Sequence, residues 1–212
     1  MTVLFDLDGT LTDSQIGIIT SMNHALVQMG RSPLPAEELS IYLGPPLHQT
    51  FRNLLDTEEE EMVLSAVTAY REYFGVKGLF ENEVYPGIPE LLGRLQGEGI
   101  DLYVATSKPV FYARQIIDHF GLTKFFRDIY GSEMDGTRSG KHDLIAYILE
   151  QEGLKKEETW MVGDRRHDIE GAAAHTLRSV GVLWGYGSPE ELKEAGATHL
   201  CTHPSEFPQL AI

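Results

Sequence analysis

Short apolar runs alternate with helical patterns over most of this 212-residue chain. The runs have the length and composition of buried strands, and each ends near Gly, Asp, Ser or Thr. They read "TVLF", "DLYVA", "DIYG", "TWMVG" and "RSVGVLW". Strands that alternate with helices are typical of a parallel sheet covered on both faces. We therefore predict an α/β fold with a doubly wound parallel sheet, in which ligands bind at the carboxyl ends of the strands.

The helical pattern is clear in "KHDLIAYILEQEG", residues 141–153. Its apolar side chains recur at the spacing of one helix face and form a stripe suited to packing against a sheet. The stripe consists of Leu144, Ile145, Ile148 and Leu149. Gly153 follows at the position where glycine commonly ends a helix, so we predict that the helix stops there.

Residues 15–84 interrupt the alternation, because they show helical patterns only. We expect helices at about 16–29, 46–55 and 59–74, separated by prolines at positions 33, 35, 45 and 46. The segment starts just after the polar loop behind the first strand and ends before Pro86 and Gly87. We therefore expect a core domain made of residues 1–14 and 85–212, with an all-helical cap domain, residues 15–84, inserted over that loop.

Composition narrows the class of protein. A hydrophobic content of 42% with 23% charged residues is ordinary for a globular protein. The net charge of −15 argues against broad binding to nucleic acid or anionic membranes, which needs clustered Lys and Arg. The sequence shows neither a membrane-spanning run nor a signal peptide, and its single cysteine, Cys201, excludes an internal disulfide framework. We expect a cytoplasmic enzyme or binding protein without a nucleic-acid or membrane partner.

Polar side chains gather where the apolar runs end. In chain order they are Asp6, Asp8, Gly9 and Thr10 after the first run, Thr106, Ser107 and Lys108 after the second, Lys141 at a helix start, and Asp164 and Asp168 in "GDRRHD". The carboxyl ends of parallel strands meet at one edge of a sheet. We therefore expect these carboxylates, hydroxyl groups and lysines to converge.

Such a group of carboxylates suits a hard cation. Burying like charges together is costly unless a counter-charge compensates for them. Mg²⁺ favours a few carboxylates completed by water and substrate oxygens. We expect Asp6, Asp8 and Asp164 to supply oxygen ligands, with Asp168, four residues after Asp164, as a further or supporting ligand. The cofactor predicted from these residues is Mg²⁺.

The remaining polar groups suit a phosphate bound beside that cation. Lys141, the hydroxyls of Thr106 and Ser107, and backbone N–H groups in the turn around Gly9 and Thr10 are candidates to bind phosphate oxygens. A carboxylate that attacks phosphorus forms an aspartyl phosphate. A second carboxylate nearby could protonate the leaving oxygen and later take a proton from the attacking water.

Four short motifs, in order, make the chain resemble the haloacid dehalogenase-like hydrolase superfamily. The first motif, Asp-x-Asp-Gly-Thr, is matched by "DLDGT" at 6–10. The second, an apolar strand ending in Thr or Ser, is matched by "LYVATSKP", and the third, a lysine at a helix, by Lys141. The fourth, Gly-Asp-x-x-x-Asp, is matched by "GDRRHD". The resemblance covers nearly the whole chain and implies a Rossmann-like core with the small helical cap of the family's first subclass.

The resemblance also implies a role for each motif residue. Asp6 would be the nucleophile and Asp8 the general acid and base. Thr106 and Lys141 would bind the phosphoryl group. Mg²⁺ would be held by Asp6, Asp164 and the backbone carbonyl of Asp8.

Several reactions occur in this superfamily, and the residues separate some of them. The family's dehalogenases lack the second aspartate, so Asp8 argues against dehalogenation. Relatives that cleave phosphonates use a cap lysine, whereas Lys77 is the only lysine in 15–84 and lies near the far end of that segment. Phosphomonoester hydrolysis is the leading prediction, and a phosphomutase similar to β-phosphoglucomutase stays open. A non-catalytic phosphate-binding or signalling module is a weaker alternative. The signalling modules that combine similar residues are response-regulator receivers, and these have no cap like the one expected at 15–84.

The substrate prediction depends on the cap. "GPPL" at 44–47, together with "GSEMDGTRSGKHDLI" at 131–145, resembles the branch that includes phosphoglycolate phosphatases and 5′-nucleotidases. A small phosphorylated metabolite is therefore expected, either phosphoglycolate or a nucleoside 5′-monophosphate. Rigid prolines such as Pro45 could present His48 and Arg52 to the substrate, or these residues could simply begin a solvated helix. We expect a monomer or a small homo-oligomer.

Overall fold

The computed structural model describes residues 1–207 and divides the chain into two compact units. One unit consists of Met1–Asp13 with Val84–Ile212, and the other of Ser14–Glu83. The borders expected from the sequence, 14/15 and 84/85, lie one residue away from these.

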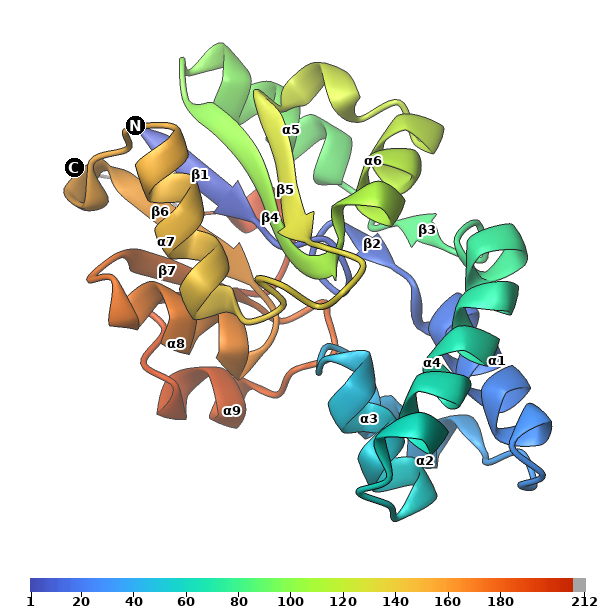
Figure 1. Cartoon of the computed structure of the whole chain (residues 1–212). Coiled ribbons are helices and arrows are strands. Elements are labelled where there is room, and N and C mark those ends of the chain that lie inside the picture. The colour runs from blue at the N-terminus through green and yellow to red at the C-terminus, as the bar shows by residue number, and fades with distance from the viewer. Residues whose placement is uncertain (208–212) are drawn as a thin grey trace. The chain divides into compact units, whose positions relative to one another are not determined.

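The larger unit is built on a six-stranded parallel sheet with the order β5-β4-β1-β6-β7-β8. The strands are β1 (Thr2–Phe5), β4 (Asp101–Pro109), β5 (Asp128–Ser132), β6 (Thr159–Gly163), β7 (Arg178–Val182) and β8 (His199–Cys201). The first strand is central, and the later strands are added first on one side of it and then on the other (Figure 1). The predicted α/β fold with a doubly wound parallel sheet is therefore confirmed.

Burial explains why the central strands β1 and β6 are apolar beyond their first residue, a threonine in each. All residues of β1 and β6 are buried, because helices cover both faces of the sheet. Leu4 lies in register with Tyr103 of β4 on one side and with Met161 of β6 on the other. This pairing brings the carboxyl ends of the three strands to one edge, beyond which the chain continues into polar loops.

Helices cover both faces of the sheet (Figure 1). The helices of this unit are α5 (Ile88–Gly97), α6 (Val110–His119), α7 (Lys141–Gln151), α8 (Arg166–Ala174) and α9 (Pro189–Glu194), with short turns η3 (Thr123–Phe125), η4 (Lys156–Glu158) and η5 (Pro204–Glu206). The predicted stripe of α7 packs with α8 against Leu4, Tyr103 and Met161, and α5 and α6 lie on the opposite face. Gly153 follows α7 with a φ of 60°, as expected of a residue that ends a helix.

Two predicted strands end at clearly different residues in the structure, and one strand was not predicted. The second apolar run continues as β4 through polar residues to Pro109, because it pairs with β5 beyond a bulge between Ala105 and Pro109. The last run ends as a strand at Val182, so Leu183 and Trp184 belong to the following loop. Strand β8, which has three residues and lies at the edge of the sheet, was not predicted.

The smaller unit is helical. Its helices are α1 (Gln15–Gln28), α2 (Ala36–Leu39), η1 (Ser40–Tyr42), α3 (Leu47–Leu55), α4 (Glu60–Tyr73) and η2 (Phe74–Gly78). The three expected helices are present with ends shifted by one residue. Helix α1 and η2 approach closely at Gly17, where a Cβ atom would lie 2.0 Å from the backbone oxygen of Gly78. Glycine is therefore required at this crossing.

The expectation that residues 15–84 contain helices only is wrong at their end. Glu83–Val84 form the short strand β3, which pairs with β2 (Thr12–Asp13) in a two-stranded sheet. The chain therefore leaves the larger unit and returns to it along two paired segments. Neither segment is long or apolar enough to be recognised as a strand from its sequence.

Candidate active site

Asp6 lies at the carboxyl end of β1, the central strand. Its N–H donates to the backbone oxygen of Val162 in β6 at 2.9 Å, so the backbone keeps the geometry of the sheet up to this residue. Its carboxylate Oδ1 accepts a hydrogen bond from the N–H of Leu7 at 2.7 Å. The side chain is therefore fixed where the strand ends and is only 12% exposed.

The turn after Asp6 is held by its own backbone. The oxygen of Leu7 accepts hydrogen bonds from the N–H groups of Thr10, Leu11 and Thr12, and the N–H of Gly9 donates to Thr12. Gly9 has a φ of 80°, and a Cβ atom on it would lie 2.3 Å from the carboxylate of Asp164. Glycine is thus needed both for the turn and for close packing. Since Gly9 and Thr10 donate within the turn, their binding of phosphate stays a prediction.

Asp164 and Asp168 reach the site from different elements. Asp164 follows β6, and its carboxylate accepts hydrogen bonds from the hydroxyl of Thr10 at 3.2 Å and the N–H of Tyr186 at 2.8 Å. Asp168 stands in the first turn of α8, where it accepts from the N–H of Arg165 at 3.1 Å and caps the helix. Because α8 begins at Arg166, the two aspartates do not share a helix face as their four-residue spacing suggested.

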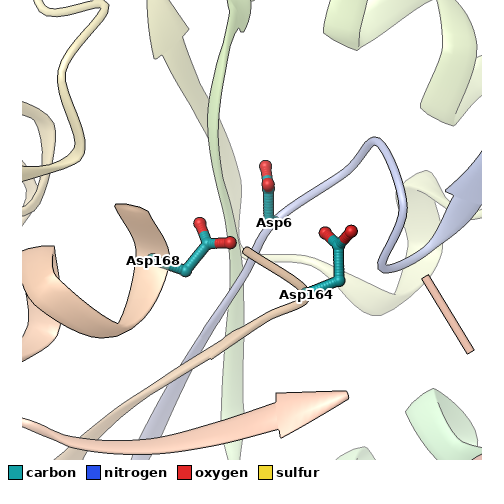
Figure 2. A group of neighbouring side chains, drawn as sticks. All are labelled: Asp6, Asp164 and Asp168. Carbon is teal, nitrogen blue, oxygen red and sulfur yellow. The ribbon is translucent and has the colours of Figure 1, made fainter. Parts of the chain in front are cut away.

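Three buried carboxylates meet in this region (Figure 2). Asp6, Asp164 and Asp168 each offer an oxygen, and these oxygens lie within 4.8 Å of one another. We call these three residues the carboxylate triad. Asp8, which was predicted as a ligand together with Asp6 and Asp164, is not a member of this group within the described residues. Its backbone carbonyl, the atom that the family resemblance assigns to the cation, stays a prediction.

Burial favours the protonated, uncharged forms of Asp6 and Asp164 over their ionised forms. Removal from water raises the pKa of Asp6 to about 7; Lys141 lowers it, and Asp168 and Asp8 raise it further. Burial also raises the pKa of Asp164 well above its usual value, and the charges of Asp168 and Asp6 add to this. A divalent cation would reverse this preference by favouring the ionised forms, so the donor set fits a hard metal ion.

Lys141 lies within the triad rather than at its border. Its Nζ atom donates to Asp6 at 2.8 Å, to Asp168 at 2.7 Å and to the backbone oxygen of Ala105 at 2.7 Å. Burial by itself lowers the pKa of Lys141, but the two carboxylates outweigh it and raise the pKa. The ammonium group is therefore charged, and its three donors are directed at fixed acceptors.

The strand β4 brings a second lysine to the site. Lys108 Nζ donates to Asp8 Oδ1 at 2.7 Å, and the two side chains are only 7% and 14% exposed. The predicted phosphate ligand Thr106 is buried beside it and accepts a hydrogen bond from the N–H of Lys108 at 3.2 Å. The backbone oxygen of Ser107 accepts from the hydroxyl of Ser132 in β5. Lys108 was expected at this edge from its place after the second apolar run, but without a role.

A loop that the sequence analysis missed closes the site from the side of β7. The indole N–H of Trp184 donates to the backbone oxygen of Thr10, and a Cβ atom on Gly185 would lie 2.2 Å from the oxygen of Gly9. The backbone N–H of Tyr186 donates to the carboxylate of Asp164, and the hydroxyl of Tyr186 donates to Asp13 at 3.0 Å. The glycine-rich "WGYG" at the carboxyl end of an apolar run was the signal that could have identified this loop.

The predicted specificity residues belong to the smaller unit. Pro45 precedes α3, and His48 lies in its first turn. Arg52 pairs with Glu60 at 2.5 Å and with Glu58 at 3.8 Å. Within this unit the arginine is therefore engaged by acidic neighbours, and a role in substrate binding stays a prediction.

The comparison with known protein families agrees with the arrangement of Asp6, Asp164, Asp168 and Lys141 described above. Residues 3–182 match the family model described as haloacid dehalogenase-like hydrolase. The chain belongs to this family. The resemblance inferred from the four motifs is thus confirmed, and so is the prediction that the protein is an enzyme of the hydrolase class. Among residues 1–207, no helix is long and apolar enough to cross a membrane.

Several known proteins resemble the chain over nearly its full length. It is 47% identical to a 5′-nucleotidase of Pseudomonas aeruginosa, over 94% of this chain and 90% of that protein. It is 42% identical to the tyrosine-protein kinase PtkA of Mycobacterium tuberculosis, over 98% and 70%. A crystal structure of a predicted phosphatase from Clostridium acetobutylicum superposes with a TM-score of 0.90 at 44% identity, covering 94% of this chain and 92% of that one. More distant relatives include proteins named phosphoglycolate phosphatase.

Proposed function

We propose that this hydrolase removes the phosphoryl group from small phosphomonoesters through an aspartyl-phosphate intermediate on Asp6. The observation that carries the proposal is the meeting of the carboxylate triad with Lys141 at the carboxyl edge of β1. Such an arrangement offers a nucleophilic oxygen, a cation site and a fixed positive charge within one buried region. This is the set of groups that transfer of a dianionic phosphoryl group requires.

The triad is the proposed site for Mg²⁺. Asp6 and Asp164 would hold the ion, with Asp168 as a further or supporting ligand and the backbone carbonyl of Asp8 completing the protein's contribution. When bound, the ion would supply positive charge against the oxygens of the phosphoryl group. Lys141 supplies charge of the same sign, and the hydroxyl of Thr106 and the groups of Ser107 at the end of β4 are the proposed remaining contacts to phosphate.

The chemistry needs two aspartates with different tasks. A carboxylate oxygen of Asp6 attacks phosphorus, and the bond from phosphorus to the leaving oxygen breaks while Asp8 in its acid form donates a proton to that oxygen. Water then attacks the phosphorus of the aspartyl phosphate and gives a proton to the Asp8 carboxylate. The products are an alcohol and inorganic phosphate, and both aspartates return to their starting forms.

A nucleoside 5′-monophosphate is the substrate that we favour, since the relative with 47% identity over nearly the whole chain is named a 5′-nucleotidase. Phosphoglycolate is the next candidate, on the basis of the more distant relatives. We propose that the helical unit, Ser14–Glu83, acts as the cap and selects among such substrates through residues near Pro45, His48 and Arg52. A cytoplasmic location and a monomer or small homo-oligomer remain part of this proposal.

The decisive experiment is phosphate release by the purified protein from nucleoside 5′-monophosphates and 2-phosphoglycolate, with Mg²⁺ and with a chelator. We expect turnover that requires the metal and is abolished by Asp6→Asn. The matched control is Asp143→Asn, a substitution of the same kind at a side chain of α7 that is 75% exposed, and this variant should retain activity. Undiminished phosphate release by Asp6→Asn would refute the mechanism.

Two further arms of the same experiment test the alternatives. Conversion of β-glucose 1-phosphate to its 6-phosphate without release of phosphate would indicate a phosphomutase. Transfer of phosphate from ATP to protein tyrosine would indicate an activity like that named for the mycobacterial relative. Net release of inorganic phosphate as the dominant product supports the hydrolase.

A further inference from the structure

Each aspartate of the "DLD" motif has a lysine of its own. Lys141 binds Asp6 within the carboxylate triad, whereas Lys108 binds Asp8. Because β1 and β4 are neighbours with Phe5 opposite Val104, Asp8 and Lys108 both lie at the carboxyl edge of the sheet, Asp8 after β1 and Lys108 in the last part of β4. The two lysines therefore hold the two carboxylates in different places.

The backbone that carries Lys108 is fixed by hydrogen bonds and by close packing. The hydroxyl of Ser132 donates to the oxygen of Ser107, and the N–H of Lys108 donates to Thr106. Gly131 of β5 packs so closely that a Cβ atom on it would lie 2.4 Å from the oxygen of Lys108. The polar extension of β4 is thus part of the sheet, and it delivers the ammonium group to a defined position.

The hydrogen bond from Lys108 fixes the orientation of the Asp8 carboxylate. A charge-assisted hydrogen bond of 2.7 Å between side chains that are 7% and 14% exposed is protected from water and strongly directional. Asp8 is two residues from Asp6 on the same turn, yet its carboxylate is not among the oxygens that lie within 4.8 Å of one another in the triad. A divalent cation at the triad would attract a nearby ionised carboxylate, and the ion pair with Lys108 opposes that attraction.

We propose that Lys108 is a positioning residue that keeps the carboxylate of Asp8 out of the cation site, so that it remains available for proton transfer. This inference rests on the proposed function, since it assumes a cation at the triad and a proton-transfer task for Asp8. Removal of Lys108 takes away one restraint on the carboxylate of Asp8, and we expect this carboxylate then to replace a water molecule as an additional ligand of the cation. The enzyme then binds the metal more tightly and works more slowly.

Mn²⁺ binding in the absence of substrate tests this directly, because the bound ion can be counted by electron paramagnetic resonance and its water by proton relaxation. Lys108→Met should bind Mn²⁺ on the order of tenfold more tightly than the wild type, about 1.4 kcal/mol. The bound ion should carry about one water molecule fewer, since a carboxylate has replaced it. Lys108→Arg, which retains the charge and the donor, should bind Mn²⁺ as the wild type does.

Loss of a positive charge near a cation site tightens metal binding by itself. This charge effect must be separated from the proposed effect, in which the carboxylate of Asp8 becomes a metal ligand. The same Lys108→Met substitution is therefore measured in an Asp8→Asn background. A pure charge effect produces the same gain in both backgrounds, whereas the proposed effect requires a larger gain when Asp8 is present. Lys156→Met, which removes an exposed lysine from η4 before the amino end of β6, is the control for net charge. Circular dichroism of every variant establishes that it is folded.

Equal gains in the two backgrounds, or no loss of bound water, would overturn the positioning role. Steady-state kinetics provide the second readout: Lys108→Met should lower kcat with a smaller change in KM, and Lys108→Arg should recover kcat. The outcomes remain separable from those for the proposed function. If Asp6→Asn abolishes phosphate release while the two Mn²⁺ gains are equal, only the role of Lys108 fails; if Asp6→Asn is fully active, the phosphatase mechanism fails.

Discussion

The indole N–H of Trp184 donates a hydrogen bond to the backbone oxygen of Thr10 at 2.9 Å, although the two residues are 174 positions apart. The bond ties the loop after β7 to the turn after β1. Thr10 in turn donates its hydroxyl to Asp164, so the bond supports one carboxylate of the triad through the turn. Residues without a catalytic role thereby fix the geometry of the site.

Replacing Trp184 with phenylalanine should loosen this support. The variant loses the hydrogen bond but keeps an aromatic ring, so we expect the free energy of unfolding to fall by about 1 kcal/mol. Phosphate release should fall as well, because the turn that holds Asp164 is less constrained. Urea denaturation and steady-state kinetics provide the two measurements. A variant with unchanged stability and unchanged kcat would show that the bond contributes nothing to the site.

Gly185 should tolerate no side chain. A Cβ atom there would lie 2.2 Å from the oxygen of Gly9 and 2.4 Å from Cβ of Asp164, both in the wall of the site. Gly185→Ala should therefore displace the loop, at a cost of about 1–3 kcal/mol, and should weaken Mn²⁺ binding and turnover. Isothermal titration with Mn²⁺ and thermal denaturation measure the two effects.

The matched control for this substitution is Gly97→Ala. Gly97 is the last residue of α5, and a Cβ atom on it would meet nothing within 4 Å. Alanine favours a helix over glycine by up to about 1 kcal/mol, so this variant should be as stable as the wild type or slightly more so. Equal behaviour of the two alanine variants would contradict the close packing of Gly185.

The strand-end residues could be predicted from the sequence because their signal is local. Asp6 and Asp164 each follow an apolar run directly, and parallel strands bring such positions to one edge. The pairing of Lys108 with Asp8 was not predictable in this way. It depends on β4 continuing through polar residues to Pro109, which only the pairing with β5 beyond a bulge makes possible.

The loop around Trp184 was missed for a different reason. Its contacts with Thr10 and Asp164 join positions far apart in the chain, and neither a period of apolar residues nor a motif spacing reports such contacts. The spacing of Asp164 and Asp168 indicated that their side chains meet, and they do. The expected reason, a shared helix face, was wrong. A capping aspartate at the start of α8 meets a loop aspartate, instead of two residues on one helix face.

The raised pKa values predict how stability depends on pH. Burial raises the pKa of Asp6 to about 7 from 3.8 and raises that of Asp164 in the same direction. At pH values between the pKa of the unfolded chain and that of the folded protein, these carboxyl groups are protonated in the folded, metal-free protein and ionised in the unfolded chain. Its free energy of unfolding should therefore fall as pH rises from about 4 to 7, by up to about 1.4 kcal/mol per pH unit for each such proton.

Urea denaturation of the metal-free protein at several pH values tests this slope. Asp6→Asn cannot ionise, so the variant should gain stability relative to the wild type as pH rises through the same window. Mg²⁺ should stabilise the wild type more at pH 8 than at pH 5, because it binds the ionised triad. A wild-type protein that becomes more stable relative to Asp6→Asn between pH 4 and 7 would contradict the raised pKa.

Lys141 should be far more important to stability than an exposed lysine. Lys141→Met leaves Asp6 and Asp168 buried without their ammonium partner, which costs about 3–5 kcal/mol for a buried pair. The control is Lys155→Met. Lys155 pairs with Glu158 at a similar distance, 2.8 Å, but its side chain is 66% exposed, so the loss should stay below about 1 kcal/mol.

A double variant separates the loss of charge balance from the loss of packing. Adding Asp168→Asn to Lys141→Met removes one of the two uncompensated carboxylates, so the double variant should be more stable than the sum of the single losses indicates, by about 0.5–3 kcal/mol. Packing lost around the lysine stem beside Gly171 would be unaffected by the second change. Strictly additive losses in urea denaturation would mean that Lys141 stabilises the core by packing, and that its charge does not hold the triad together.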